Sequence, residues 1–186
     1  ATRVAINGFG RIGRTIFKAL LDRKIPLEVV AINDLETPVE LAYLLKYDSV
    51  HGVWPHEVSG TENELIVDGK SFQCVKISDP AQSPWRDLKV AIVLESSGRF
   101  ADRDSCQKHI NAGAQKVIVT APGKGMDATF VIGVNEGTYD PRIHHIVSNA
   151  SCTTNCLAPI VSLLHDRFVV EHGLMTTIHS YTMDQR

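Results

Sequence analysis

The sequence contains few cysteines, almost no net charge and no long apolar run. Four cysteines in 186 residues are too few for a disulfide-stapled scaffold. A formal net charge of −2 gives no basic footprint, so we expect no nucleic-acid partner. Since no apolar run approaches the length of a membrane span, we expect no membrane partner. With 44% hydrophobic and 22% charged residues, the composition is typical of a soluble globular protein.

We expect no signal peptide, and the sequence shows no internal repeats or low-complexity segments. Ala1-Thr2-Arg3 leads directly into an apolar stretch, which gives no sign of a signal peptide. The few cysteines then fit a reducing compartment, and we expect a cytoplasmic protein. What remains is an alternation of strand-like and helix-like segments, which is typical of the α/β class.

A glycine-rich turn follows the first predicted strand. That strand spans residues 3–7, and the motif G-x-G-x-x-G follows it as GFGRIG at positions 8–13. In this context Gly8 permits the tight turn, Gly10 lets the backbone approach a diphosphate, and Gly13 lets helix and strand pack closely. A helix comes next, and its apolar face consists of Ile12, Ile16, Phe17, Leu20 and Leu21. We therefore predict that a dinucleotide diphosphate binds at the N-terminus of this helix.

An acidic residue closes the second predicted strand. Residues 27–32 are followed by Asn33-Asp34, about 20 residues beyond the glycines, where an acid holds the ribose hydroxyls of a dinucleotide. An aspartate at this position repels a 2′-phosphate, so we expect NAD in preference to NADP. Together these features predict a Rossmann-type doubly wound sheet with NAD as its cofactor.

The segment SNASCTTNC at 148–156 contains the candidate nucleophile, Cys152. A strand over residues 143–147 precedes it, and a helix begins near Cys152, with its apolar face formed by Leu157, Ile160, Val161 and Leu164. A thiol in the first turn of a helix faces unpaired N–H groups and the positive end of the helix dipole, which favour the thiolate. His179, in a predicted strand over 174–180, is the candidate base. Taken singly, a packing cysteine and a structural histidine are the commoner cases.

Taken together, these residues resemble the phosphorylating glyceraldehyde-3-phosphate dehydrogenases. The matching segments are VAINGFGRIGR at 4–14, LLKYDSVHG at 44–52, SNASCTTNCLAP at 148–159 and GLMTTIHSYTMDQR at 173–186. The resemblance implies an NAD-binding Rossmann domain over residues 1–150. Residues 151–186 would then be the start of an α+β catalytic domain that is incomplete in this chain. Members of the family are usually homotetramers.

The resemblance also assigns roles to matching positions. Cys152 would attack the aldehyde of glyceraldehyde 3-phosphate, and His179 would act as the base. Inorganic phosphate would cleave the resulting thioester to give 1,3-bisphosphoglycerate, a step of glycolysis. The positions that match substrate or phosphate contacts are Ser151, Cys152, Thr153 and Thr182. The expected cofactor contacts are Asn7, Gly8, Gly10, Arg11, Ile12, Gly13, Asp34, Ser97 and Thr120.

Two alternatives remain open at this point. Erythrose-4-phosphate dehydrogenase shares the cysteine segment and the cofactor site, but it hydrolyses its thioester. A non-catalytic NAD-binding fragment is the second alternative, because family members are about twice as long as this chain. A lone helix and strand after residue 150 cannot bury their apolar faces. We therefore expect the 186 residues alone not to form a competent enzyme.

Further elements complete the prediction. Residues 37–40, Thr-Pro-Val-Glu, form a capping box before a helix whose apolar face carries Leu41, Leu44 and Leu45. Residues 64–67 and 70–75, joined by Asp68-Gly69, predict a β-hairpin that makes the sheet mixed. We also predict strands over 90–94 and 116–120 and a helix over 102–112 that Gly113 ends.

Other cysteines and histidines do not form a convincing metal site. Cys106 and His109 have ligand-like spacing on a predicted helix, but no second pair accompanies them. His144 and His145, adjacent on a strand, would point to opposite faces. Cys156 lies one helical turn from Cys152, where a packing role is commoner than a redox switch. We predict no metal.

Overall fold

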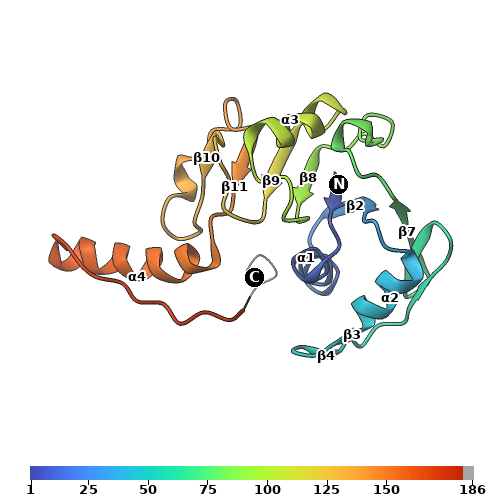
Figure 1. Ribbon diagram of the computed structural model, residues 1–186, viewed down its shortest axis with the longest axis horizontal. Coiled ribbons are helices and arrows are strands. Elements are labelled where there is room, and N and C mark those ends of the chain that lie inside the picture. Colours follow the sequence, from blue (N-terminus) through green and yellow to red (C-terminus); the bar gives the residue numbers. More distant parts are fainter. Residues whose placement is uncertain (182–186) are drawn as a thin grey trace.

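The computed structural model describes residues 1–181, and within them a nine-stranded sheet carries helices on both faces (Figure 1). The strand order is β10-β11-β9-β8-β1-β2-β7-β6-β5. The parallel strands are β1 (Thr2–Asn7), β2 (Leu27–Asn33), β8 (Ile92–Glu95), β9 (Lys116–Val119), β10 (Ala128–Thr129) and β11 (Ile146–Ser148). β1 lies between β2 and β8, so the strands that follow β1 are added first on one side of it and then on the other. Parallel α/β sheets bind their ligands at the carboxyl ends of the strands at such a point.

The predicted hairpin forms one edge of this sheet. β6 (Glu64–Val67) and β7 (Lys70–Val75) pair antiparallel, and β5 (Val58–Gly60) extends the edge. β7 pairs with β2 in parallel. The prediction of a mixed, parallel-dominated α/β sheet is therefore confirmed. A separate two-stranded ribbon is formed by β3 (Tyr47–Asp48) and β4 (Gly52–Val53).

Two apolar clusters hold helices against opposite faces of the sheet. Val4 and Ile6 of β1 belong to the cluster that contains Phe17 of α1 (Arg11–Asp22) and Leu41 of α2 (Pro38–Lys46). Ala5 of β1 belongs to the other cluster, under α3 (Arg103–Asn111). Because side chains alternate along a strand, β1 contributes to both cores and is buried on both faces.

Helices α2 and α3 begin where side chains satisfy free backbone N–H groups. Thr37 and Glu40 form the predicted capping box: Glu40 N donates to Thr37 Oγ1 at 3.3 Å, and Thr37 N donates to Glu40 Oε2 at 3.0 Å. These hydrogen bonds from Thr37 lower the pKa of the exposed Glu40 carboxyl. The carboxylate of Asp102 caps α3 by accepting from Ser105 N at 2.9 Å. Each of these caps supplies a partner for a backbone N–H group that the helix itself leaves without one.

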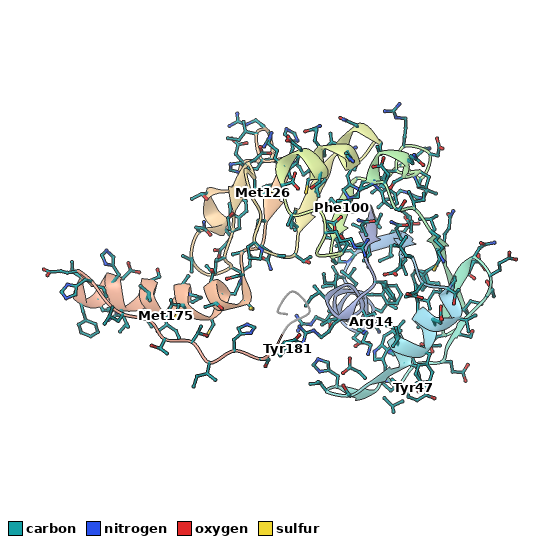
Figure 2. All side chains as sticks on the ribbon, viewed as in Figure 1. Arg14, Tyr47, Phe100, Met126, Met175 and Tyr181 are labelled. Atoms are coloured by element: carbon teal, nitrogen blue, oxygen red, sulfur yellow. The ribbon has the colours of Figure 1, made fainter. Side chains whose placement is uncertain are left out.

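The last described helix, α4 (Cys152–Phe168), extends away from the sheet (Figure 1). It begins at the predicted residue, but the apolar face predicted for it is not buried: Ile160 is 56% and Leu164 43% exposed. Figure 2 shows the α4 side chains projecting into solvent, with Met175 of the following segment alongside. Within residues 1–181 this helix therefore has no buried residues.

The strand predicted over residues 174–180 is wrong. Residues 169–181 run back along α4 toward α1 without regular structure (Figure 1). A strand is held by backbone hydrogen bonds to a neighbouring strand, and no strand within residues 1–181 lies beside this segment. The side chains of Leu174 and Ile178 are accordingly fully exposed.

Several predicted boundaries also shift. The strand predicted over 90–94 begins only at Ile92, because Lys89 has a φ of 50° and the N–H of Val90 turns back to Trp85 O. The strand predicted over 143–147 begins at Ile146, since His144 N donates to Asp140 O in a turn. His144 therefore lies outside a strand. The predicted apolar faces of α1 and α2 are also one residue too wide, because Ile12 and Leu44 are exposed.

The sheet face opposite α3 is partly open around β9 and β11. A hollow of about 320 Å³ is lined there by Ile92, Ile118 and Val147 together with Phe130 and Tyr139. Two short 3₁₀ turns complete the fold: η1 (Pro80–Gln82) lies between β7 and β8 and packs against α3, and η2 (Glu136–Thr138) lies between β10 and β11. None of the helices within residues 1–181 has the length and apolar character needed to cross a bilayer.

Candidate active site

The glycine turn between β1 and α1 adopts the conformation that its motif requires. Gly8 has a φ of +90°, and a Cβ there would lie 2.4 Å from Ser97 Cα. A Cβ on Gly13 would lie 2.2 Å from Gly8 O, so both positions exclude a side chain. A Cβ on Gly10 would meet nothing within 4 Å, and no described side chain caps α1 there. The turn therefore leaves open space in front of a helix N-terminus, as a bound diphosphate needs.

Asp34 lies at the carboxyl end of β2, directly beside the glycine turn. Its Oδ2 accepts a hydrogen bond from Phe9 N at 2.6 Å, and its Oδ1 accepts from Glu36 N at 3.1 Å. The carboxylate thus fixes the glycine turn of the neighbouring strand. The side chain is half-buried, so it remains partly accessible to solvent.

Three further predicted cofactor residues meet at Glu95, the last residue of β8. Asn7 Nδ2 donates to Glu95 Oε2 at 2.5 Å, and Ser97 N donates to Glu95 Oε1 at 2.8 Å. Thr120, just after β9, donates from N and Oγ1 to the backbone carbonyl of Glu95, at 3.0 and 3.2 Å. The fold therefore brings the carboxyl ends of β1, β8 and β9 to one acidic residue.

Cys152 and His179 are in direct contact although 27 positions separate them. Cys152 Sγ lies 2.9 Å from His179 Nε2, and His179 Nδ1 lies 2.7 Å from Ser180 O. A carbonyl oxygen only accepts, so Nδ1 carries a proton and Nε2 faces the sulfur. The hydrogen bond from His179 is the main cause of a lowered pKa of the Cys152 thiol, and Thr153 contributes.

The imidazole shifts in the complementary direction. The Ser180 carbonyl is the main cause of a raised pKa of His179, and Cys152 adds to it. Both shifts favour a thiolate paired with an imidazolium, which is the reactive form of such a pair. The positive charge of Arg11 opposes the rise in the pKa of His179.

Ser151 and Thr153, two more of the predicted contacts, lie at the start of α4. Ser151 is its N-cap, and its hydroxyl accepts from Thr154 N at 2.9 Å. Thr153 lies in the first turn beside Cys152. Thr182 lies outside the described residues. The sequence therefore located two groups, the glycine turn with its neighbours and the thiol pair with its helix cap.

The other two cysteines with shifted pKa values differ chemically from Cys152. Burial is the main cause that raises the pKa of Cys74 to about 11 and that of Cys106 to about 12. Cys106 Sγ donates to Phe100 O at 3.3 Å, while both ring nitrogens of His109 have hydrogen-bond partners. Across residues 1–181, no three acidic, histidine or cysteine side chains are grouped as metal ligands.

Comparison with protein families gives a consistent assignment. Residues 2–103 match the model described as the NAD binding domain of glyceraldehyde 3-phosphate dehydrogenase, and residues 151–186 match its C-terminal domain. The chain belongs to the glyceraldehyde-3-phosphate dehydrogenase family. Its fold is accordingly that of the family's NAD-binding domain, with the thiol pair in the segment that matches the C-terminal domain.

Individual relatives agree with the family model. The chain is 54% identical over 186 residues to a glyceraldehyde-3-phosphate dehydrogenase of Geobacillus stearothermophilus, covering 100% of the chain and 55% of that protein. It is 56% identical over 185 residues to the Thermotoga maritima enzyme of the same name, again covering 55% of it. The chain therefore spans about half the length of the curated relatives it matches.

The sequence prediction did not assign a role to two residues that shape the site. Glu95 could have been recognised in the sequence, because it is a charged residue at the end of an otherwise apolar strand. Ser148 gave no such signal, although its buried hydroxyl donates to Ala121 O at 2.7 Å and accepts from Ala150 N at 3.0 Å. This serine links the exit of β9 to the turn before Cys152, where Ala150 has a left-handed φ of 60°.

Proposed function

We propose that this chain is the N-terminal part of a phosphorylating glyceraldehyde-3-phosphate dehydrogenase. The contact of 2.9 Å between Cys152 Sγ and His179 Nε2, at the start of a helix, carries the proposal. The enzyme would convert glyceraldehyde 3-phosphate, NAD and inorganic phosphate to 1,3-bisphosphoglycerate. Residues 1–150 would form the NAD-binding domain and residues 151–186 the start of the catalytic domain. We further propose a cytoplasmic homotetramer, as the resemblance implies.

The cofactor site fits NAD. The open space at Gly10 and the uncapped start of α1 suit a diphosphate, with Arg11 and Ile12 offering backbone N–H groups of the first turn. The Asp34 carboxylate suits a ribose diol and repels a 2′-phosphate. When bound, NAD supplies the acceptor for the hydride that leaves the substrate.

Cys152 and His179 would carry out the covalent steps. The Cys152 thiolate attacks the aldehyde carbon, a C–S bond forms, and the imidazolium of His179 gives its proton to the carbonyl oxygen. The neutral imidazole then takes back the hydroxyl proton as hydride leaves the same carbon, which yields a thioester. A phosphate oxygen attacks the thioester carbon, the C–S bond breaks, and the Cys152 thiolate is regenerated with the acyl phosphate as product.

The N-terminus of α4 would support the anionic groups of this reaction. Backbone N–H groups at a helix start stabilise negative charge, both on the thiolate and on the oxygen of a tetrahedral intermediate. Ser151 and Thr153 place hydroxyl groups on either side of the sulfur-bearing residue. Both are suited to phosphate oxygens.

Steady-state kinetics of the full-length protein test the proposal. We expect NADH formation from glyceraldehyde 3-phosphate that depends on inorganic phosphate. Cys152→Ala should abolish it, and His179→Gln should lower kcat by about 10²- to 10⁴-fold. Cys156→Ser, one helical turn away, is the matched control and should retain activity. Phosphate-independent turnover, or an active Cys152→Ala variant, would contradict the proposal.

The two alternatives make different predictions in the same assay. An erythrose-4-phosphate dehydrogenase would turn over erythrose 4-phosphate faster, with no need of phosphate. The names of the matched relatives favour the glyceraldehyde enzyme. A non-catalytic module would bind NAD without turnover, even in its full-length form.

A further inference from the structure

The side chain of Glu95 is a buried carboxylate without a cationic partner. It is 2% exposed and lies at the carboxyl end of β8, beside the point where the sheet reverses its strand order. Within residues 1–181 its only ion-pair candidate is His109. A carboxylate removed from water is costly unless hydrogen bonds replace its hydration, so its surroundings need an explanation.

Four hydrogen bonds converge on the two carboxylate oxygens. Oε2 accepts from Asn7 Nδ2 at 2.5 Å and lies 2.9 Å from His109 Nε2. Oε1 accepts from Ser97 N at 2.8 Å and from Ser97 Oγ. An ionised carboxylate only accepts, and its two oxygens have room for these four donors. The site is therefore built for Glu95 in its ionised form.

The hydrogen bond from Trp85 determines which ring nitrogen of His109 carries the proton. Trp85 Nε1 is a donor only, and it donates to His109 Nδ1 at 2.9 Å. Nδ1 therefore carries no proton, and Nε2–H donates to Glu95. Trp85 and His109 are both fully buried, and His109 lies on α3.

The same network reaches four neighbouring strands. Asn33 at the end of β2 donates from Nδ2 to Asn7 Oδ1 at 2.6 Å, and Asn7 in turn donates to Glu95. Thr120 after β9 donates to the Glu95 carbonyl. Because a Cβ on Gly8 would lie 2.4 Å from Ser97 Cα, the position of Ser97 also limits where the glycine turn can lie.

We propose that Glu95, held by His109 and Trp85, is the positioning residue of the NAD site. Its carboxylate holds Asn7 and Ser97, its backbone carbonyl holds Thr120, and all three are expected cofactor contacts. Glu95 itself would not touch the reacting atoms. This inference rests on the proposed NAD-dependent function. It predicts that loss of the carboxylate weakens cofactor binding and leaves the thiol chemistry intact.

Glu95→Gln in the full-length protein is the central test. The glutamine amide replaces one of the two carboxylate oxygens by an NH₂ group. That NH₂ group is a donor and would face either Asn7 and His109 or Ser97, which now donate to the oxygen in its place. We expect the Kd for NAD, measured by isothermal titration calorimetry, to rise by about 10- to 100-fold. KM for NAD should rise with it, while kcat at saturating NAD changes by less than about threefold. The alkylation rate of Cys152 without cofactor should stay unchanged.

Two control variants separate positioning from general stability. Glu57→Gln makes the same chemical change at an exposed position and should bind NAD as tightly as the parent protein. Val93→Ala removes a buried side chain two residues before Glu95, on the same strand, and should lower Tm without weakening NAD binding. If Val93→Ala raises the Kd as much as Glu95→Gln, the effect is one of stability and the proposal is wrong.

Variants of His109 test the network at a distance from the cofactor. His109→Phe keeps an aromatic ring but removes the donor to Glu95, and we expect the Kd for NAD to rise by about 3- to 10-fold. His109→Gln can place its amide near the position of Nε2 and should restore most of the affinity. Equal effects of both substitutions would contradict a role of the Glu95 hydrogen bond.

The outcomes also distinguish this inference from the proposed function. If the parent protein neither binds NAD nor forms NADH, the proposed function itself fails. If the parent protein binds NAD and Glu95→Gln binds it equally tightly, the function stands and the positioning role of Glu95 is refuted.

Discussion

Iodoacetamide should modify Cys152 well before Cys74 and Cys106. The thiolate is the reacting species, so the rate depends on its population. An ordinary thiol is a few per cent ionised at pH 7. With a pKa of about 11, Cys74 has only roughly one thiolate in ten thousand molecules, and Cys106, at about 12, has tenfold fewer. The pKa of Cys152, by contrast, lies below the ordinary value of a thiol, mainly because of the hydrogen bond from His179.

The expected ratio of rates follows from two opposing effects. Even an ordinary pKa would give Cys152 roughly 300 times the thiolate population of Cys74. A more basic thiolate is intrinsically more nucleophilic, and this reduces the rate advantage of Cys152 over Cys74 by roughly a factor of ten. A preference of at least roughly 20-fold for Cys152 remains, and burial of the other two side chains adds to it.

The assay is peptide mapping by mass spectrometry after brief alkylation of the full-length protein. Repeating it between pH 5 and 9 should show that Cys152 still reacts at a pH where an ordinary thiol has become slow. His179→Gln should move this profile to higher pH, since it removes the main cause of the lowered pKa. Equal labelling of Cys152 and Cys74, or a profile that His179→Gln leaves unchanged, would refute the thiolate–imidazolium pair.

Two further predictions concern stability. Phe17 is fully buried, with ring centroids 4.9 Å from Phe72 and 5.5 Å from Phe9, so Phe17→Ala should lower the free energy of unfolding by about 3–5 kcal/mol in urea denaturation; a loss below about 1 kcal/mol would contradict this packing. His56 lies 2.5 Å from Asp68 and 3.1 Å from Asp22, and these carboxylates, Asp68 first, raise its pKa. Its contribution to stability is then fully present below about pH 6.5 and is lost as the pH rises through the raised folded-state pKa. The stability difference between the parent protein and His56→Asn should therefore shrink from pH 6 to pH 9, and a difference that stays constant over this range would contradict the raised pKa.

Local sequence signals located the elements whose causes are local. The glycine turn at 8–13, the Thr37–Glu40 capping box and the Asp68-Gly69 hairpin were all predicted, because backbone conformation and nearby hydrogen bonds define each of them. The start of α4 at Cys152 was predicted for the same reason, since Ser151 caps it from the adjacent position. The strand over 174–180 failed because β-branched residues favour a strand only where another strand offers hydrogen bonds.

The sequence by itself determined the Rossmann-type fold class and the family, and it singled out Cys152 and His179 as the proposed nucleophile and base. Only the tertiary structure decided that Cys152 Sγ and His179 Nε2 lie 2.9 Å apart, and that Glu95 joins the ends of β1, β8 and β9. The physical reason is the range of the forces involved. Turns, caps and periodic apolar faces depend on neighbours within a few residues. The hydrogen bond between Asn7 and Glu95, 88 positions apart, exists only after the sheet and its crossovers have formed. The contact between Cys152 and His179, 27 positions apart, exists only after the chain has turned back along α4.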